Sequence, residues 1–141
     1  MDGSQTPIWH PISRLPLIAS LIDEPLCDCE DQLQNLNPPG REAPILDDAL
    51  VERIIRVYRE QEEMLPVYEE QLSRWKRETL TQEQQQEISR LETQLNRYRT
   101  VLNQILRLAR EHEEFTIEKV IERDDAQVGL DVLLGKMDKW L

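Results

Sequence analysis

The residues in this chain with the most obvious chemical potential are a histidine and the acidic groups beside it. His112 follows Glu111 and precedes Glu113 and Glu114. Imidazole and carboxylate groups bind metals and transfer protons, so a metal or acid–base site is the first hypothesis. The helical metal motifs do not fit, because HExxH is absent and the Glu-x-x-His of di-iron bundles would need glutamate where Ala109 stands. We interpret His112 as a histidine at a helix end, where its protonated form interacts favourably with the helix dipole.

Further acidic residues recur at helical spacing after this histidine. Four of them are separated by four, four and three positions: Glu114, Glu118, Glu122 and Asp125. On one unbroken helix they would share a face, and such a row of carboxylates can bind Mg²⁺ for phosphate chemistry. Lys119 and Arg123 interleave with the row, and no partner segment offers a second acidic pair at matching spacing. A solvated face of mixed charge is the simpler interpretation.

The two cysteines, Cys27 and Cys29, offer little chemistry of their own. On a helix, side chains two positions apart point about 200° from each other, so this pair cannot share a tetrahedral zinc site. The neighbouring Asp28 and Glu30 would raise a thiol pKa rather than lower it. A catalytic pairing with His10 would rest on co-occurrence alone, and the chain has no glycine-rich phosphate loop. We therefore predict no catalytic residue, no metal ligand and no cofactor.

The amino-acid composition favours a helical protein and disfavours a nucleic-acid-binding or membrane-spanning one. The 141 residues carry a net charge of −11, with 32% charged and only 5% aromatic residues, which favours long helices with wide polar faces. A strongly acidic balance disfavours direct contact with nucleic acid. No apolar run approaches the roughly 18 residues of a membrane span, and no secretory leader is visible. With too few cysteines for a disulfide framework, the sequence indicates a soluble cytoplasmic protein.

The strongest structural pattern lies in the second half of the chain. Positions separated alternately by three and four residues are apolar or aromatic: Ile88, Leu91, Leu95, Tyr98, Leu102, Ile105 and Ala109. This spacing predicts a long amphipathic helix with a coiled-coil-like stripe. Thr81 followed by Gln84 reads as a capping box that opens it.

A second amphipathic helix is predicted upstream, with Asp47 or Asp48 as its cap. Its stripe has a nearly seven-residue period: Leu50, Ile54, Val57, Met64, Tyr68, Leu72 and Trp75. We interpret this stripe and the one from Ile88 to Ile105 as core packing, a dimer seam, or both. Gln61 stands where an apolar residue is due, and Pro66 predicts a bend near Glu62. A neighbouring stripe of Val51, Ile55, Tyr58 and Leu65 is surplus to a two-helix hairpin, so a third helix or a second chain must cover it.

The remaining segments flank this pair. We divide the chain into an extended arm (1–12), a helix kinked near Pro25 (13–36), a linker (37–46), a helical hairpin (47–115) and short C-terminal helices (116–141) that begin at Thr116 and at Asp124 or Asp125. The fold class is all-α: a long antiparallel, coiled-coil-like hairpin whose flanking N- and C-terminal helices complete a small helical bundle.

Surplus apolar surface without a catalytic constellation predicts a non-enzymatic helical interaction or scaffold protein, a homodimer with or without another protein partner. Trp9, Trp75 and Trp140 are either contact anchors or core-edge residues. The arginines are interpreted as members of surface salt bridges: Arg53, Arg56, Arg59, Arg97, Arg99, Arg107 and Arg110. Two alternatives stay open, namely an acidic inhibitor or nucleic-acid mimic acting on another protein, and a metal-dependent all-α phosphohydrolase.

Overall fold

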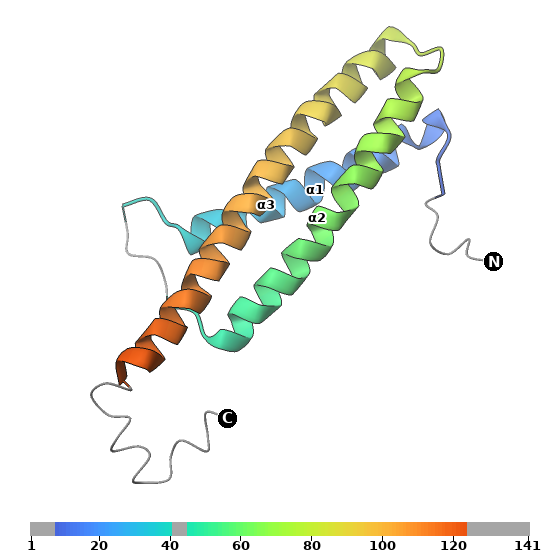
Figure 1. Ribbon diagram of the computed structural model, residues 1–141. Coiled ribbons are helices and arrows are strands. Elements are labelled where there is room, and N and C mark those ends of the chain that lie inside the picture. The colour runs from blue at the N-terminus through green and yellow to red at the C-terminus, as the bar shows by residue number, and fades with distance from the viewer. Residues whose placement is uncertain (1–7, 41–44, 124–141) are drawn as a thin grey trace, which may run out of the picture.

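The computed structural model describes residues 8–40 and 45–123, with side chains described up to Glu113. A short 3-10 helix, η2 (Ile12–Arg14), leads into three α-helices: α1 (Leu15–Leu36), α2 (Asp48–Lys76) and α3 (Gln82–Arg123). These described segments contain no strand, so the all-α class is confirmed for them (Figure 1). Within the same residues, no helix combines the length and apolar character needed to cross a membrane.

Local hydrogen bonds fix where the two long helices begin. The Asp47 carboxylate accepts a hydrogen bond from the Leu50 N–H at 2.8 Å and so caps α2. At the start of α3, the Gln84 N–H donates to Thr81 Oγ1 at 3.1 Å, while the Thr81 N–H donates to Gln84 Oε1 at 2.9 Å. This reciprocal pair is the capping box that the sequence predicts, and it satisfies two backbone donors that a helix start leaves open.

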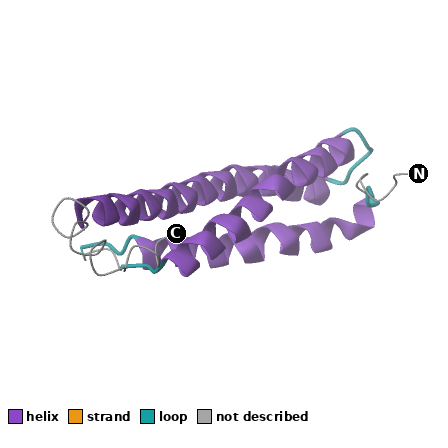
Figure 2. Cartoon of the chain, turned by 60° about the horizontal axis from the view of Figure 1, so that its bottom comes forward, coloured by secondary structure: helices purple, strands orange, loops and turns teal. Residues whose placement is uncertain are grey.

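α3 is the helix against which both other helices pack. On one side Lys76 of α2 pairs with Glu92, and Glu69 pairs with Arg99, so residue numbers fall along α2 as they rise along α3. On the other side Asp23 of α1 pairs with Arg90, seven residues before the Glu30–Arg97 pair, so numbers along α1 and α3 rise together. The turned view shows α1 lying along one side of the α2–α3 pair (Figure 2).

The predicted stripe of α3 forms the centre of the core. All seven of its apolar residues are buried: Ile88, Leu91, Leu95, Tyr98, Leu102, Ile105 and Ala109. From α1, Ile18, Ile22, Leu26 and Cys29 are buried in the same cluster. The third helix that the surplus apolar surface called for is therefore α1.

The stripe of α2 is set one position away from the predicted one. Ile54, Leu72 and Trp75 are buried and Tyr68 is half-buried as expected, but Leu50 is 40% and Met64 43% exposed, and Val57 is half-buried. Val51 and Leu65 are buried in their place, with Tyr58 packed against the core. Of the two roles predicted for the stripe, Leu50 and Met64 therefore do not have core packing, because two neighbouring stripes on this helix both repeat every seven residues and only one can face α3.

Neither internal proline starts a new helix. α1 continues through Pro25 and α2 continues through Pro66. α3 likewise continues through Thr116 to Arg123, which makes the predicted new helix at Thr116 wrong. Residues 112–123 contain neither glycine nor proline, so no residue there interrupts the backbone hydrogen bonds of the helix. The short helices expected from Asp124 or Asp125 onward lie outside the described residues.

Candidate functional site

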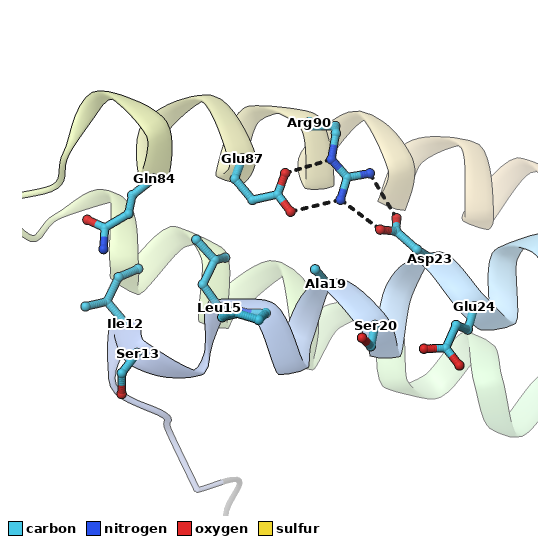
Figure 3. A pocket seen from close by; sticks show the side chains of 11 residues that line it. Ile12, Ser13, Leu15, Ala19, Ser20, Asp23, Glu24, Gln84, Glu87 and Arg90 are labelled. Atoms are coloured by element: carbon cyan, nitrogen blue, oxygen red, sulfur yellow. Dashed lines mark hydrogen bonds and ion pairs between the residues drawn. The ribbon is translucent and has the colours of Figure 1, made fainter.

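A groove lies where the start of α1 meets the start of α3. Its volume is about 700 Å³, and Leu15, Pro16 and Ala19 supply its apolar wall. Figure 3 shows the polar side of the groove, with Arg90 of α3 reaching across to Asp23 of α1. The Arg90 guanidinium donates to both Asp23 oxygens at 2.7 and 3.1 Å and to Glu87 Oε1 at 2.7 Å. One cation therefore bridges two carboxylates and ties the two helices together.

These contacts keep both carboxylates ionised. Hydrogen bonds from Arg90 lower the pKa of Asp23 and of Glu87 below their ordinary values, and the Gln94 amide adds a further donor to Asp23. The same two partners raise the pKa of Arg90. A carboxyl group that serves as a general acid or base near neutral pH needs its pKa moved the other way. The groove is thus equipped to position charges and apolar surface rather than to transfer protons.

The middle of the bundle contains a polar contact that joins all three helices. Gln61 Oε1 of α2 accepts a hydrogen bond from the Tyr98 hydroxyl of α3 at 2.5 Å and from Cys29 Sγ of α1 at 3.3 Å. Burial, and then the charges of Asp28 and Glu30, raise the pKa of Cys29 to about 12, so this thiol is kept protonated and unreactive. Burial also raises the pKa of Tyr98. Gln61 stands where the stripe lacks an apolar residue, and its side-chain oxygen accepts the hydrogen bonds of both Tyr98 and Cys29.

The exposed side of α2 carries a second row of side chains at seven-residue spacing. We call Leu50, Val57 and Met64 the outer stripe. Arg53 lies three residues after Leu50 and four before Val57, which places it beside the stripe on the helix surface. Of the seven arginines predicted to form surface salt bridges, five form no ion pair with a described carboxylate: Arg53, Arg56, Arg59, Arg107 and Arg110. Their interpretation as salt-bridge members was wrong, whereas Arg97 and Arg99 do pair.

The sequence candidates for chemistry are not brought together. His112 is half-buried within α3, which continues to Arg123, so its interpretation as a helix-end residue was wrong. Cys27 is exposed while Cys29 is buried, and both thiols are free. Among the described residues, no three histidine, cysteine or acidic side chains are placed to hold a metal ion. The carboxylate row from Glu114 onward lies outside the described side chains.

The described surface contains both ion pairs and carboxylates without an ion pair, among them the exposed Glu24, Asp28 and Asp31 on one side of α1. Carboxylates of α1, α2 and α3 pair with basic groups in the contacts Asp23–Arg90, Glu69–Arg99 and Glu92–Lys76.

Sequence reasoning missed two features. One is the Asp23–Arg90 contact, whose partners are 67 positions apart. The other is Gln71, a polar side chain that is only 3% exposed. Gln71 follows Met64 by seven positions, so its place on the outer stripe was visible, but nothing in the sequence indicates what covers it.

Comparisons of the chain with protein-family models, with curated proteins and with solved structures find no match.

Proposed function

We propose that the protein is a non-enzymatic helical interaction protein that works as a homodimer, with α2 and α3 as an antiparallel, coiled-coil-like hairpin scaffold. The observation that carries this proposal is the outer stripe. Leu50 and Met64 stay 40% and 43% exposed although the core has its full set of apolar side chains from α1, α2 and α3. Apolar residues at heptad positions are the usual seam between paired helices.

The surroundings of the stripe support an interface as well. Arg53 lies beside Leu50 and Val57, without an ion pair to a described carboxylate. Arginine is enriched at binding hot spots because its planar head makes several hydrogen bonds at once. A second copy offers Glu52, Glu60 and Glu63 from the same helix as partners for such a group. The cytoplasm suits this function, since its reducing conditions keep the two free cysteines as thiols.

Sedimentation equilibrium at micromolar concentration tests the proposal. We expect a dimer mass for the native chain, and a shift toward monomer for Met64→Glu, because the substitution places a charge in the seam. Gln86→Glu is the matched control, since it adds the same charge at an exposed position of α3 away from the stripe. A monomer mass for the native chain, or equal masses for the two variants, would contradict the proposed interface.

Ionic strength gives a second readout of the same interface. Each copy carries a net charge of −11, so two copies repel each other at long range. Salt screens this repulsion and leaves apolar burial intact, so the dimer is expected to tighten between low and physiological salt. Weakening with salt would instead indicate that ion pairs drive the association.

A further inference from the structure

The end of α2 holds an extended segment by its backbone. Residues 8–11 precede η2 and lie against this end of the helix. The His10 N–H donates to Gln71 Oε1 at 2.7 Å, and the Gln71 amide nitrogen donates back to the His10 carbonyl at 3.3 Å. The Trp75 indole N–H donates to the same carbonyl at 2.9 Å. Two side chains one helical turn apart therefore satisfy both polar groups of a single residue.

The bound segment contributes little by its own side chains. Ile8 is 84% exposed, and Trp9 and His10 are only half-buried. The one described ring contact is the Trp9 indole beneath the Arg74 guanidinium, 4.3 Å from its centroid. Pro11 follows with φ −69° and ψ 160°, an extended conformation of the polyproline type. The segment is thus recognised through its backbone, with an aromatic ring on one side and a proline on the other.

The side chains that bind this segment, Gln71 and Trp75, are in contrast buried. Gln71 is 3% exposed and is the one buried polar side chain in the described part of the chain, and Trp75 beside it has no exposed surface. A buried amide is unfavourable unless both its oxygen and its nitrogen find partners. An apolar residue would close this end of the core without that requirement. The amide at position 71 is therefore matched to one task, which is to bind a backbone N–H and C=O together.

The outer stripe lies on the same side of α2 as Gln71. Gln71 continues the seven-residue repeat of Leu50, Val57 and Met64, so all four lie on one side of α2. At Gln71 this side is covered by residues 8–11, and at Met64 it is exposed. A longer segment seated on Gln71 would pass onto apolar surface at once.

We propose that Gln71 and Trp75 form a docking site for an extended peptide of a partner protein, and that the chain's own residues 8–11 occupy this site as an internal competitor. The partner segment has an aromatic residue, then a residue with a free backbone N–H, then proline. The inference rests on the proposed interaction function, because it names a partner class, but it does not depend on the homodimer. A bound internal segment lowers the apparent affinity for an external one by the fraction of time the site is free.

A peptide titration of the full-length chain tests this. The probe is the synthetic peptide TPIWHPI, which copies residues 6–12, and the readout is the NMR signal of the Trp75 indole N–H. Loosening the internal segment with Trp9→Ala and His10→Pro, which remove the ring contact and the N–H donor, should tighten peptide binding by roughly tenfold over the native chain. Trp9→Ala alone leaves every backbone contact in place and should give a smaller gain. It serves as the second variant should the double substitution disturb folding.

Two controls separate backbone recognition from general stickiness. A peptide with proline in place of the histidine lacks the donor to Gln71 Oε1 and should not shift the indole signal. The loosened chain with an added Gln71→Leu keeps an apolar residue at that place and should also fail to bind. Equal binding by this variant, or no shift in the loosened chain at millimolar peptide, would overturn the docking site.

The outcome is distinguishable from that of the dimer proposal. A monomer that binds the peptide supports the docking site and contradicts the homodimer. A dimer that gives no peptide-induced shift supports the homodimer and contradicts the docking site.

Discussion

The two halves of the α2–α3 pair use similar residues in different ways. In the half nearest the connecting turn, residues 65–76 of α2 and 82–99 of α3, basic side chains are engaged, as in Arg90 with Asp23 and Arg99 with Glu69. In the far half, residues 48–64 and 100–123, Arg53 and Arg107 pair with no described carboxylate, and Leu50 is exposed. Residues 8–11 contact the first half at Gln71 and Trp75. α1 runs along both halves, from Asp23 beside Arg90 to Leu33 beside Arg107 and Leu108.

The comparison shows which charged and apolar side chains of the helical pair have partners within the chain. In the turn half, the three arginines of α3, Arg90, Arg97 and Arg99, each form an ion pair with α1 or α2. In the far half, the exposed Leu50 of α2 lies three positions before Arg53, which forms no ion pair with a described carboxylate. A surface of exposed leucine and methionine next to arginine that forms no internal ion pair has the composition of an interaction site. The difference between the halves is therefore one of internal ion pairing, and the homodimer interface proposed above uses the exposed residues of the far half.

The largest effect is expected from removing core volume in the turn half. Leu72 is fully buried, so Leu72→Ala should lower the free energy of unfolding by about 2–5 kcal/mol, measured by urea denaturation. Leu50→Ala makes the same chemical change on the exposed stripe of the far half, and as a monomer it should change stability by less than about 0.5 kcal/mol. Similar losses at both positions would remove the distinction between the halves.

The next effect concerns the polar contact where the halves meet. Gln61→Leu leaves the buried Tyr98 hydroxyl without its acceptor, which should cost about 1–3 kcal/mol of unfolding free energy. Adding Tyr98→Phe removes the orphaned group, so the double variant should be more stable than Gln61→Leu alone. A thermal-denaturation cycle of the four proteins measures this coupling, and strict additivity would show that the hydrogen bond is unimportant.

Helix caps at the two ends give a third comparison. Thr81→Ala removes the acceptor for the Gln84 N–H at the turn and should cost about 1 kcal/mol in global stability. Asp47→Ala removes the cap of α2 at the far end, where we expect local fraying of the first turn instead. Hydrogen exchange distinguishes the two, because fraying raises exchange near Leu50 without raising it in the core. Equal global losses would mean that the far end is as tightly integrated as the turn.

The smallest effect is electrostatic and depends on pH. The pKa values of Asp23 and Glu87 are lowered in the folded chain, so their stabilising contribution is present above their ordinary values of 3.8 and 4.5 and is lost as the pH falls toward the lowered ones. Because the pair is partly exposed, Asp23→Asn should cost no more than about 1 kcal/mol at neutral pH. The difference from the native chain should shrink in acid and in high salt. A pH-independent difference would point to packing instead of charge.

Periodicity was sufficient to predict α3 and its capping box, because both signals are local. It misplaced α2 by one position, since the stripes that begin at Leu50 and at Val51 both repeat every seven residues. Gln61 belongs to both alternations of three and four, so it does not separate them. The deciding position is the last one at which they differ: the alternation from Leu50 reaches Gln71, whereas the one from Val51 reaches Leu72 and stays apolar.

The candidate sites were less accessible from the sequence. The Asp23–Arg90 contact requires α1 to lie beside α3 in one direction, and no local rule sets that direction. The role of Gln71 depends on residues 8–11 returning to α2 after a separation of 61 positions. Contacts of this range are products of the whole fold, whereas caps and stripes are products of neighbouring residues.

The central position of α3 also sets an order in time. Lys76 meets Glu92 across 16 positions, whereas Asp23 meets Arg90 across 67, and closing the longer loop costs about 1.3 kcal/mol more in chain entropy. On a ribosome that adds about 5–20 residues per second, α1 emerges first and waits several seconds for its partner to be made. Of the three described α-helices, we therefore expect the first synthesised to be the last buried, with its apolar side as the surface that a chaperone would meet on the nascent chain.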